Sequence, residues 1–210
     1  YVYVSSSEVY GQAVDGPLHE AIAPRPCTVY GAGKLAGEHF ADAARVAATL
    51  PEVVIVRPFN AYGPGCHLVG EDAIEAIPRW IMQAARGETL TVHGDGRQTR
   101  DFTYVEDLAR GIVDAALSDA CVNTGPVNLC SGIERSMASV ARDVEATVAG
   151  AAAREGVAHG PARPGDLRRQ VGSASRAATL LGWSPRVSWA DGLRRTCEDV
   201  LARLDCEVPR

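Results

Sequence analysis

A strand–helix–strand pattern in the first quarter of the chain limits the possible folds more than any other feature. Residues 1–4 are aromatic or β-branched and are followed by three serines, which predicts a strand that ends in a polar loop. Residues 28–50 are rich in alanine, with apolar side chains at helical spacing, and Pro51 closes the predicted helix. Residues 53–56 form the continuous apolar run that is typical of a strand buried in a parallel sheet. We therefore expect a βαβ unit with parallel strands.

The rest of the chain continues this alternation of helices and strands. Further helices are expected over residues 74–86, 106–118, 136–148, 175–181 and 189–204. Short strands are expected over residues 89–93, 102–105 and 127–130. Ser136 is positioned to cap one helix and Gly182 to end another. The chain is thus predicted to be an α/β protein with a parallel sheet.

Composition and charge exclude several classes of protein. With 21 basic and 26 acidic residues the net charge is −5, which argues against partners such as nucleic acid or an anionic membrane. No apolar run approaches the roughly 20 residues that span a bilayer, and no signal peptide is evident, so we expect a cytoplasmic protein. The six cysteines lack C-x-x-C spacing, which favours reduced thiols over a disulfide framework. The histidines show no ligand spacing, so no metal site is expected.

Tyr30 and Lys34 are the first candidates for chemistry. Four residues apart on a helix, they lie on one face within side-chain reach. An ammonium about 5 Å from a phenolate stabilises it by roughly 3 kcal/mol at an effective dielectric constant near 20, which lowers the phenol pKa by about two units. The pair can therefore act as a general base or acid near neutral pH. Such pairs also occur by chance on many helices, so the spacing alone is weak evidence.

Three serines, Ser5 to Ser7, follow the first predicted strand. Open α/β sheets bind ligands at the carboxyl ends of their strands, so these hydroxyls are expected to face the same crevice as Tyr30. A hydroxyl, a phenol and an ammonium at such an edge are the groups needed to move a proton from a sugar alcohol. The alternative is a loop whose serines satisfy their own backbone, and for Ser5 this structural role is favoured.

Five motifs occur in order along nearly the whole chain, to about residue 204. They are Ser5–Gly11 (SSSEVYG), Tyr30–Lys34 (YGAGK), Arg57–Gly65 (RPFNAYGPG), Gly94–Thr103 (GDGRQTRDFT) and Arg163–Asp166 (RPGD). Together they resemble the extended short-chain dehydrogenase/reductase family, in its NAD-dependent nucleotide-sugar epimerase/dehydratase branch. The resemblance implies a partial Rossmann-type parallel sheet with a small α+β substrate-binding lobe.

The resemblance also implies a role for each matching residue. Tyr30 would be the catalytic base and acid, and Lys34 would hold the nicotinamide ribose and lower the pKa of Tyr30. Ser6 would hydrogen-bond the reacting sugar oxygen, and Phe59 would lie beside the nicotinamide of the NAD cofactor. The remaining roles concern the UDP- or dTDP-sugar substrate. Asn60 would contact its phosphates, and Arg100 and Arg163 would bind its diphosphate. Val92 and His93 would border its nucleotide base, and Asp166 would bind a ribose hydroxyl. Guanidinium groups suit phosphate oxygens in this way.

The family resemblance predicts two parts in the chain. Residues 1–60, with 101–125 returning to them, are expected to form the C-terminal part of the NAD-binding domain. Residues 61–100 and 126–210 are expected to form mainly the substrate-binding lobe. The glycine-rich fingerprint that binds the pyrophosphate does not occur, so the sequence resembles the C-terminal two-thirds of such an enzyme and is expected to be inactive alone.

Several functions remain open at this point. A nucleotide-sugar 4-epimerase, an isomerase that removes and returns a hydride through a keto intermediate, is favoured by the RDF and RPGD motifs. A UDP-glucuronate decarboxylase is suggested by the pair Ser7-Glu8, and a sugar 4,6-dehydratase is less favoured because Ser7 stands where dehydratases place aspartate. A non-catalytic binding module is the alternative from another class. A homodimer is expected, through the Tyr30 helix and the helix after Ile74 or Glu106.

Overall fold

The computed structural model describes residues 1–12, 16–67, 75–149, 157–163 and 165–207. The chain folds into two compact units. The first contains Tyr1–Ala61, Thr99–Glu134 and Leu167–Arg186, and the second contains Tyr62–Gln98, Arg135–Asp166 and Val187–Arg210. Each unit is built from separate stretches of the sequence, so the two units do not correspond to two halves of the chain.

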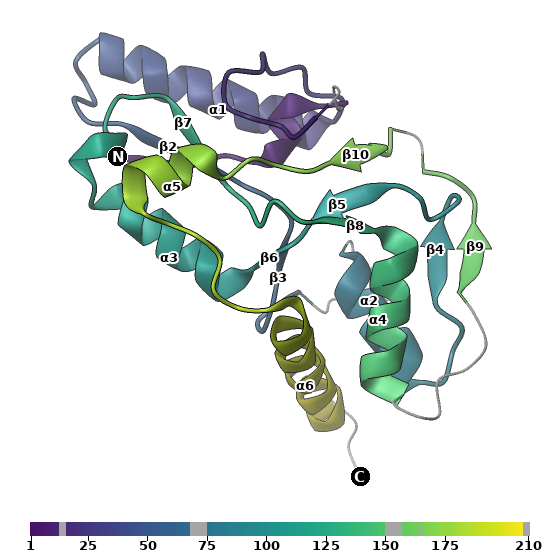
Figure 1. Cartoon of the computed structure of the whole chain (residues 1–210). Helices are drawn as coiled ribbons and strands as arrows, with labels where there is room; N and C mark the ends of the chain where they lie inside the picture. Colours follow the sequence, from purple (N-terminus) through teal and green to yellow (C-terminus); the bar gives the residue numbers. More distant parts are fainter. Residues whose placement is uncertain (13–15, 68–74, 150–156, 164, 208–210) are drawn as a thin grey trace. The chain divides into compact units, whose positions relative to one another are not determined.

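A three-stranded parallel sheet forms the centre of the first unit (Figure 1). Its strands, in spatial order, are β1 (Val2–Val4), β2 (Val54–Pro58) and β7 (Pro126–Leu129). Val2 pairs with Val54, and Ile55 pairs with Pro126, in parallel in both cases. The predicted parallel pairing of the first two strands is therefore confirmed, and the α/β class with it.

Helices cover both faces of this sheet because successive side chains of a strand point to opposite sides. Ile55 packs towards α1 (Val29–Val46) in one apolar cluster. Its neighbour Val56 packs in another cluster, towards α3 (Val105–Ala116) and α5 (Ser175–Leu181). The buried core of the first unit therefore lies on both sides of β2, as the continuous apolar run of that strand predicts.

The helix α1 ends earlier than the sequence predicts. Its last residue is Val46, four residues before Leu50. Ala48 adopts a φ of 56°, in the left-handed region, and this conformation stops the helix before Pro51 is reached. Two other predicted ends are confirmed: Gly182 ends α5 with a φ of 59°, and the Ser136 hydroxyl accepts a hydrogen bond from Ser139 N (3.1 Å) at the start of α4 (Met137–Ala149).

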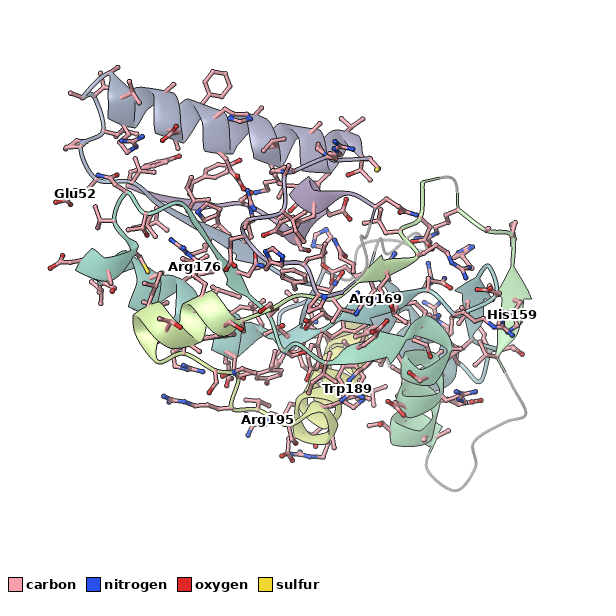
Figure 2. The ribbon with its side chains drawn as sticks, turned by 45° about the horizontal axis from the view of Figure 1, so that its top comes forward. Glu52, His159, Arg169, Arg176, Trp189 and Arg195 are labelled. Carbon is pink, nitrogen blue, oxygen red and sulfur yellow. The ribbon has the colours of Figure 1, made fainter. Side chains whose placement is uncertain are left out.

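The second unit contains α2 (Ala76–Ala85), α4, α6 (Trp189–Glu207) and the parallel strands β4 (Thr91–His93) and β9 (Ala158–Gly160). The apolar face of α2 packs against α4 and α6. Trp80 is buried in α2, and its Nε1 donates to Thr91 O (2.8 Å), which fixes α2 against β4. Trp189, labelled in Figure 2, donates to Asp143 Oδ2 (2.7 Å) and links α6 to α4.

Some short elements have no counterpart in the sequence expectations. They are β3 (Ala61–Tyr62), β5 (Thr99–Asp101), β8 (Glu134–Ser136), β9, β10 (Arg169–Gln170) and the 3-10 helices η1 (Ser7–Tyr10) and η2 (Asp119–Cys121). The strand expected over residues 102–105 shortens to β6 (Thr103–Tyr104). Strands of two or three residues, many of them polar, carry too little alternation to be recognised from sequence.

The boundaries of the two units differ from the domain expectation. Residues 126–134 and 167–186 were assigned mainly to the substrate-binding lobe, but both stretches lie in the first unit. The reason is that β7 completes the parallel sheet and α5 packs beside it. Assigning NAD binding to one unit and substrate binding to the other remains a prediction.

Two general features of the described residues bear on the class of protein. None of the helices in the described part of the chain has the length and apolar character needed to cross a bilayer. The cysteines at positions 27, 66, 121, 130 and 197 are free thiols. Burial raises the pKa of Cys197 to about 12, and it also raises the pKa of Cys130, so both thiols are protonated at neutral pH.

Candidate active site

The loop after β1 places Ser6 at the start of η1. Its Oγ accepts a hydrogen bond from Glu8 N (3.1 Å), which caps this short helix. Ser6 is largely buried, with 8% of its surface exposed. The cap uses only an oxygen lone pair, so the hydroxyl hydrogen is still available to donate. Ser6 therefore has a structural role in η1 that is compatible with the predicted bond to a sugar oxygen.

The first turn of α1 is held against η1 by two contacts. Thr28 Oγ1 accepts from Gly31 N (3.0 Å), capping α1, and donates to Glu8 Oε2 (2.6 Å). Gly31 also lies very close to η1, because a Cβ there would be 2.6 Å from Glu8 O. Glu8, Thr28 and Gly31 together fix the position of the turn that carries Tyr30.

Substitution of the two glycines in the YGAGK motif is expected to have opposite effects. Gly31→Ala should destabilise the protein by about 1–2 kcal/mol, because the added methyl group meets the Glu8 backbone. Gly33→Ala is the matched control: nothing lies within 4 Å of its Cβ position, and alanine favours the helix by about 1 kcal/mol. Urea unfolding checks both values. Equal effects of the two substitutions would contradict the close packing of α1 on η1.

Tyr30 and Lys34 lie together on α1, as their spacing predicts. Lys34 Nζ is 5.7 Å from the centroid of the Tyr30 ring and 5.7 Å from that of the Tyr3 ring. It also donates to Val4 O (3.0 Å), the last residue of β1. Tyr30 is 57% exposed and can reach a ligand. An ammonium group is thus held beside an accessible phenol at the carboxyl end of a parallel strand, where ligands bind in such sheets.

Ser5 has the structural role that was favoured for it, although through a different partner. Its Oγ donates to Glu38 Oε1 (2.5 Å), a carboxylate on α1, rather than to its own backbone. Ser5 N also donates to Val56 O (2.8 Å) in β2. Ser5 therefore joins the end of β1 to both α1 and β2, directly before Ser6.

Phe59 and Asn60 follow β2 at the same edge of the sheet. Phe59 is 2% exposed and packs in the core, where Gly172 approaches so closely that a Cβ would be 2.6 Å from its ring. Asn60 Nδ2 donates to Asp101 O (3.0 Å). The Phe59 ring is thus a core side chain, and its contact with a nicotinamide remains a prediction.

Asp101 holds together the loops around Asn60. Its Oδ1 accepts from Ser131 N (2.9 Å) and Ser131 Oγ (2.5 Å), and its Oδ2 accepts from Gly132 N (2.8 Å) and Gly172 N (3.2 Å). The residue is fully buried. A single carboxylate therefore connects the end of β5 to the loops that follow β7 and β10.

Arg100 is held by the backbone of the first unit. Its Nη1 donates to Thr99 O (2.9 Å) and to Leu167 O (2.6 Å). The contact of Arg100 with a substrate diphosphate remains a prediction.

The remaining substrate candidates lie in the second unit. Val92 pairs with His159 and His93 with Gly160 in the β4–β9 ladder, where Figure 2 labels His159. Val92 is 1% exposed, so its side chain belongs to the core and only its backbone could border a nucleotide base. His93 Nδ1 lies 3.2 Å from Pro161 O. Arg163 and Asp166, both exposed, follow β9, and the turn between them is closed by Asp166 N donating to Arg163 O (3.2 Å).

Other positioning residues escaped the sequence reasoning. Side-chain hydrogen bonds connect the segments around the site; they are made by Glu8, Thr28, Glu38, Arg57 and Asp101, to one another, to Ser5 or to backbone N–H groups. One sequence signal could have indicated Glu38: it lies four residues after Lys34, on the same helix face as Tyr30 and Lys34. Among the described residues, no group of three or more His, Cys, Asp or Glu side chains could hold a metal ion.

Comparison with known proteins places this arrangement in a class of enzymes. The family model described as GDP-mannose 4,6 dehydratase matches residues 1–196. The fold and the motifs are those of extended short-chain dehydrogenases/reductases. The chain belongs to the NAD-dependent epimerase/dehydratase family of that class.

Relatives with different activities are similarly close to the chain. UDP-glucuronic acid decarboxylase 1 of Arabidopsis thaliana is 34% identical over 212 residues, which cover 97% of this chain and 46% of that protein. UDP-glucose 4-epimerase of Mycolicibacterium smegmatis is 34% identical over 202 residues, covering 92% and 59%. The chain thus spans about half the length of the curated relatives it matches.

Solved structures agree with the fold. The UDP-glucose 4-epimerase of Thermotoga maritima with UDP-glucose has a TM-score of 0.87 and 26% identity, and the match covers 97% of this chain and 63% of that one. The UDP-glucuronic acid 4-epimerase of Bacillus cereus, in complex with UDP-glucuronic acid and NAD, has a TM-score of 0.84 and 31% identity, covering 96% and 61%.

Proposed function

We propose that this chain carries the catalytic residues and much of the sugar-nucleotide site of an NAD-dependent nucleotide-sugar 4-epimerase. The observation that carries the proposal is the Tyr30–Lys34 pair, with the ammonium 5.7 Å from the phenol ring at the end of β1. A decarboxylase and a 4-epimerase are equally identical to the chain, at 34%, so the choice between them rests on the residues themselves.

The residues present fit the nicotinamide end of NAD. Lys34 Nζ uses one of its donors on Val4 O and can offer others to ribose hydroxyls beside Tyr30. When bound, NAD accepts a hydride from a sugar carbon and later returns it. A glycine-rich loop for the pyrophosphate does not occur in the sequence, so the proposed contacts of this chain concern the nicotinamide and its ribose.

Each catalytic residue has a separate task in this proposal. Tyr30 takes the proton from the sugar hydroxyl at C4 and gives it back after the hydride has returned to the other face. Lys34 holds its ammonium group 5.7 Å from the phenol ring and would bind the nicotinamide ribose. Ser6 donates its hydroxyl hydrogen to the reacting sugar oxygen. Asn60, Arg100, Arg163 and Asp166 would bind the nucleotide, and Arg163 is exposed in the second unit.

Glu8 is the residue that separates the epimerase from the decarboxylase proposal. The pair Ser7-Glu8 resembles that of UDP-glucuronate decarboxylases, and this keeps decarboxylation as the second candidate. In this chain, however, Glu8 Oε2 accepts from the Thr28 hydroxyl at 2.6 Å and thereby braces α1. A carboxylate engaged in this way is less suited to act on a substrate, which supports the epimerase. Dehydration is the third candidate reaction, because Ser7 stands where dehydratases place an aspartate and its hydroxyl cannot act as an acid at neutral pH.

Product analysis tests the proposal. A full-length version, meaning a protein of the relatives' length that contains this chain, would be incubated with UDP-glucose, UDP-glucuronate and dTDP-glucose. Epimerisation at C4 is the expected result with at least one UDP-sugar, seen by NMR of the sugar ring. Release of CO2 with a UDP-pentose would favour the decarboxylase. A 4-keto-6-deoxy product would favour the dehydratase, and binding of the sugars without turnover would favour a non-catalytic module.

Self-association is proposed to use α1. This helix exposes three large apolar side chains, Val29, Phe40 and Val46, at 92%, 76% and 72%. The apolar face of α2 is buried within the second unit. α3 exposes Val113 and Leu117 but covers the opposite face of the sheet from α1. Because α1 and α3 cover opposite faces of the sheet, a single flat interface can contain only one of them. We favour α1 because it exposes the larger apolar surface.

Sedimentation measurements check this surface. The chain is expected to sediment as a dimer at micromolar concentration, and Phe40→Glu is expected to give a monomer because a charge replaces an aromatic ring that the proposed interface would bury. Ile133→Glu is the matched control, since Ile133 is a 53% exposed apolar residue of the same unit outside α1. A monomeric wild-type chain, or equal effects of the two substitutions, would contradict an α1 interface.

A further inference from the structure

Lys34 is the single lysine of the chain, although lysine and arginine together number 21. A lysine carries its charge at the end of a flexible four-carbon stem, with three N–H donors that rotate together. Such a stem loses much conformational freedom when its ammonium group binds a ligand. Contacts that hold the Lys34 ammonium group in place before a ligand arrives therefore lower the cost of binding.

Three contacts hold this ammonium group in the structure. Lys34 Nζ donates to Val4 O (3.0 Å) and lies 5.7 Å from the ring centroids of both Tyr3 and Tyr30. Both distances are within the roughly 6 Å range of a cation–π contact. Tyr30 has a role in the proposed chemistry, whereas Tyr3 has none. The contribution of the Tyr3 ring is therefore the one that needs an explanation.

Tyr3 contacts the backbone of Lys34 as well as its side chain. The Tyr3 hydroxyl donates to Lys34 O (3.2 Å). Burial, followed by the nearby charge of Glu38, raises the pKa of Tyr3, so this hydroxyl is protonated at neutral pH and can donate. The ring also packs against the apolar cluster that contains Ile55. The hydroxyl and the apolar packing together keep the face of the ring beside the ammonium group.

Gly37 makes room for Tyr3 on α1. It lies three residues after Lys34, and a Cβ at this position would overlap the Tyr3 hydroxyl oxygen. Glycine inside a helix is less stable than alanine, so its presence here needs a reason from packing. The close approach of Tyr3 to the Lys34 turn supplies that reason.

We propose that Tyr3 is a positioning residue for Lys34: the face of its ring holds the ammonium group beside Val4 O and Tyr30 before a nicotinamide ribose binds. The hydroxyl bond to Lys34 O keeps the ring in this place. The contact between Tyr3 and Lys34 can be measured without a cofactor. Its consequence for cofactor binding rests on the proposed function of Lys34.

NMR of the single lysine tests the contact. In the 210-residue chain labelled with ¹³C-lysine, one Cε–Hε signal set is expected, upfield of free lysine because two aromatic rings shield it. Tyr3→Leu removes one of two rings at equal distance and is expected to lose about half of this upfield shift. Tyr3→Phe removes the hydroxyl but keeps the ring, so it is expected to retain most of the shift.

Val2→Ala is the matched control for a general loosening of β1. Val2 lies on the same strand but packs in the apolar cluster on the other face of the sheet, away from Lys34. Its truncation is expected to leave the Lys34 signal at the wild-type position. An unchanged signal in Tyr3→Leu, an equal change in Val2→Ala, or a change in Tyr3→Phe as large as that in Tyr3→Leu would overturn the proposal.

Gly37→Ala provides a second variant that alters neither Tyr3 nor Lys34. The added methyl group displaces the Tyr3 ring, so the Lys34 signal is expected to move in the same direction as in Tyr3→Leu. Gly33→Ala on the same helix meets nothing within 4 Å and is expected to leave the signal unchanged. If Tyr3→Leu fails to fold, this pair decides, and equal signals in the two glycine variants would contradict the proposal.

NAD binding to a full-length version tests the consequence for the cofactor. Tyr3→Leu is expected to weaken binding roughly 2–5-fold in calorimetry, the effect of one cation–π contact at an accessible site, and Tyr3→Phe is expected to bind as the wild type does. A lost Lys34 shift in Tyr3→Leu with unchanged NAD affinity would reject the positioning role. Unchanged NAD affinity in Lys34→Met would instead reject the proposed function of Lys34, whatever the NMR signal of Tyr3→Leu shows.

Discussion

Replacing Tyr30 by phenylalanine in a full-length version is expected to lower kcat by about 10²–10⁴-fold, with little change in KM. The phenol acts on the proton that moves in the reaction and contributes little to binding in the ground state. The removed hydroxyl belongs to a side chain that is 57% exposed, so the fold should tolerate its loss. Steady-state kinetics with the preferred nucleotide sugar measures both constants.

Arg163→Ala provides the contrasting variant. A diphosphate clamp acts equally in the ground and transition states, so this substitution is expected to raise KM or Kd and to leave kcat nearly unchanged. Charge-assisted hydrogen bonds are worth about 1.5–3 kcal/mol, which corresponds to a weakening of roughly 10–150-fold. If Tyr30→Phe kept near-normal turnover but bound the substrate much more weakly, Tyr30 would only contact the substrate and would not be the catalytic base.

Replacing Asp101 is expected to have the largest effect on stability. Asp101→Ala leaves three backbone N–H groups without their acceptor, the buried one of Gly172 and the part-buried ones of Ser131 and Gly132. An unsatisfied buried group costs about 1–3 kcal/mol, and a part-buried one that water can reach costs less, so the expected total loss is roughly 2–4 kcal/mol. Urea unfolding followed by circular dichroism measures this loss.

Two further variants show whether the Asp101 hydrogen bonds cause that loss. Asp101→Asn keeps the shape but has one acceptor oxygen instead of two, so an intermediate loss is expected. Asp42→Ala removes an exposed carboxylate paired with Arg45 and should change the unfolding free energy by less than about 0.5 kcal/mol. If Asp101→Ala were as mild as Asp42→Ala, the clamping role of Asp101 would be wrong.

The elements predicted best from sequence are those whose local pattern coincides with their tertiary environment. β2 reads as a continuous apolar run because both of its faces are covered, by α1 on one side and by α3 and α5 on the other. Tyr30 and Lys34 were found because helical spacing alone brings them together. These signals lie within a few neighbouring residues and need no knowledge of distant contacts.

The features that were missed depend on contacts between distant residues. Glu38 and Arg57 are separated by 19 residues, and only the docking of α1 on β2 brings them together. Asp101 binds loops that follow two other strands, up to 71 residues away. The extension of the first compact unit beyond residue 125 was missed for the same reason, because β7 returns to the sheet beside β2 and its four residues do not indicate that partner.

A sugar labelled with deuterium at C4 tests the central claim most directly. A full-length version would be incubated in ordinary water with UDP-glucose carrying deuterium at C4, or with the UDP-sugar that product analysis has identified, and the product examined by NMR and mass spectrometry. The expected result is a C4 epimer that retains the deuterium at C4, with no incorporation from solvent and with product formation by Tyr30→Phe slower by about 10²–10⁴-fold. Loss of the deuterium to water, or its retention without inversion at C4, would contradict hydride removal and return at this site.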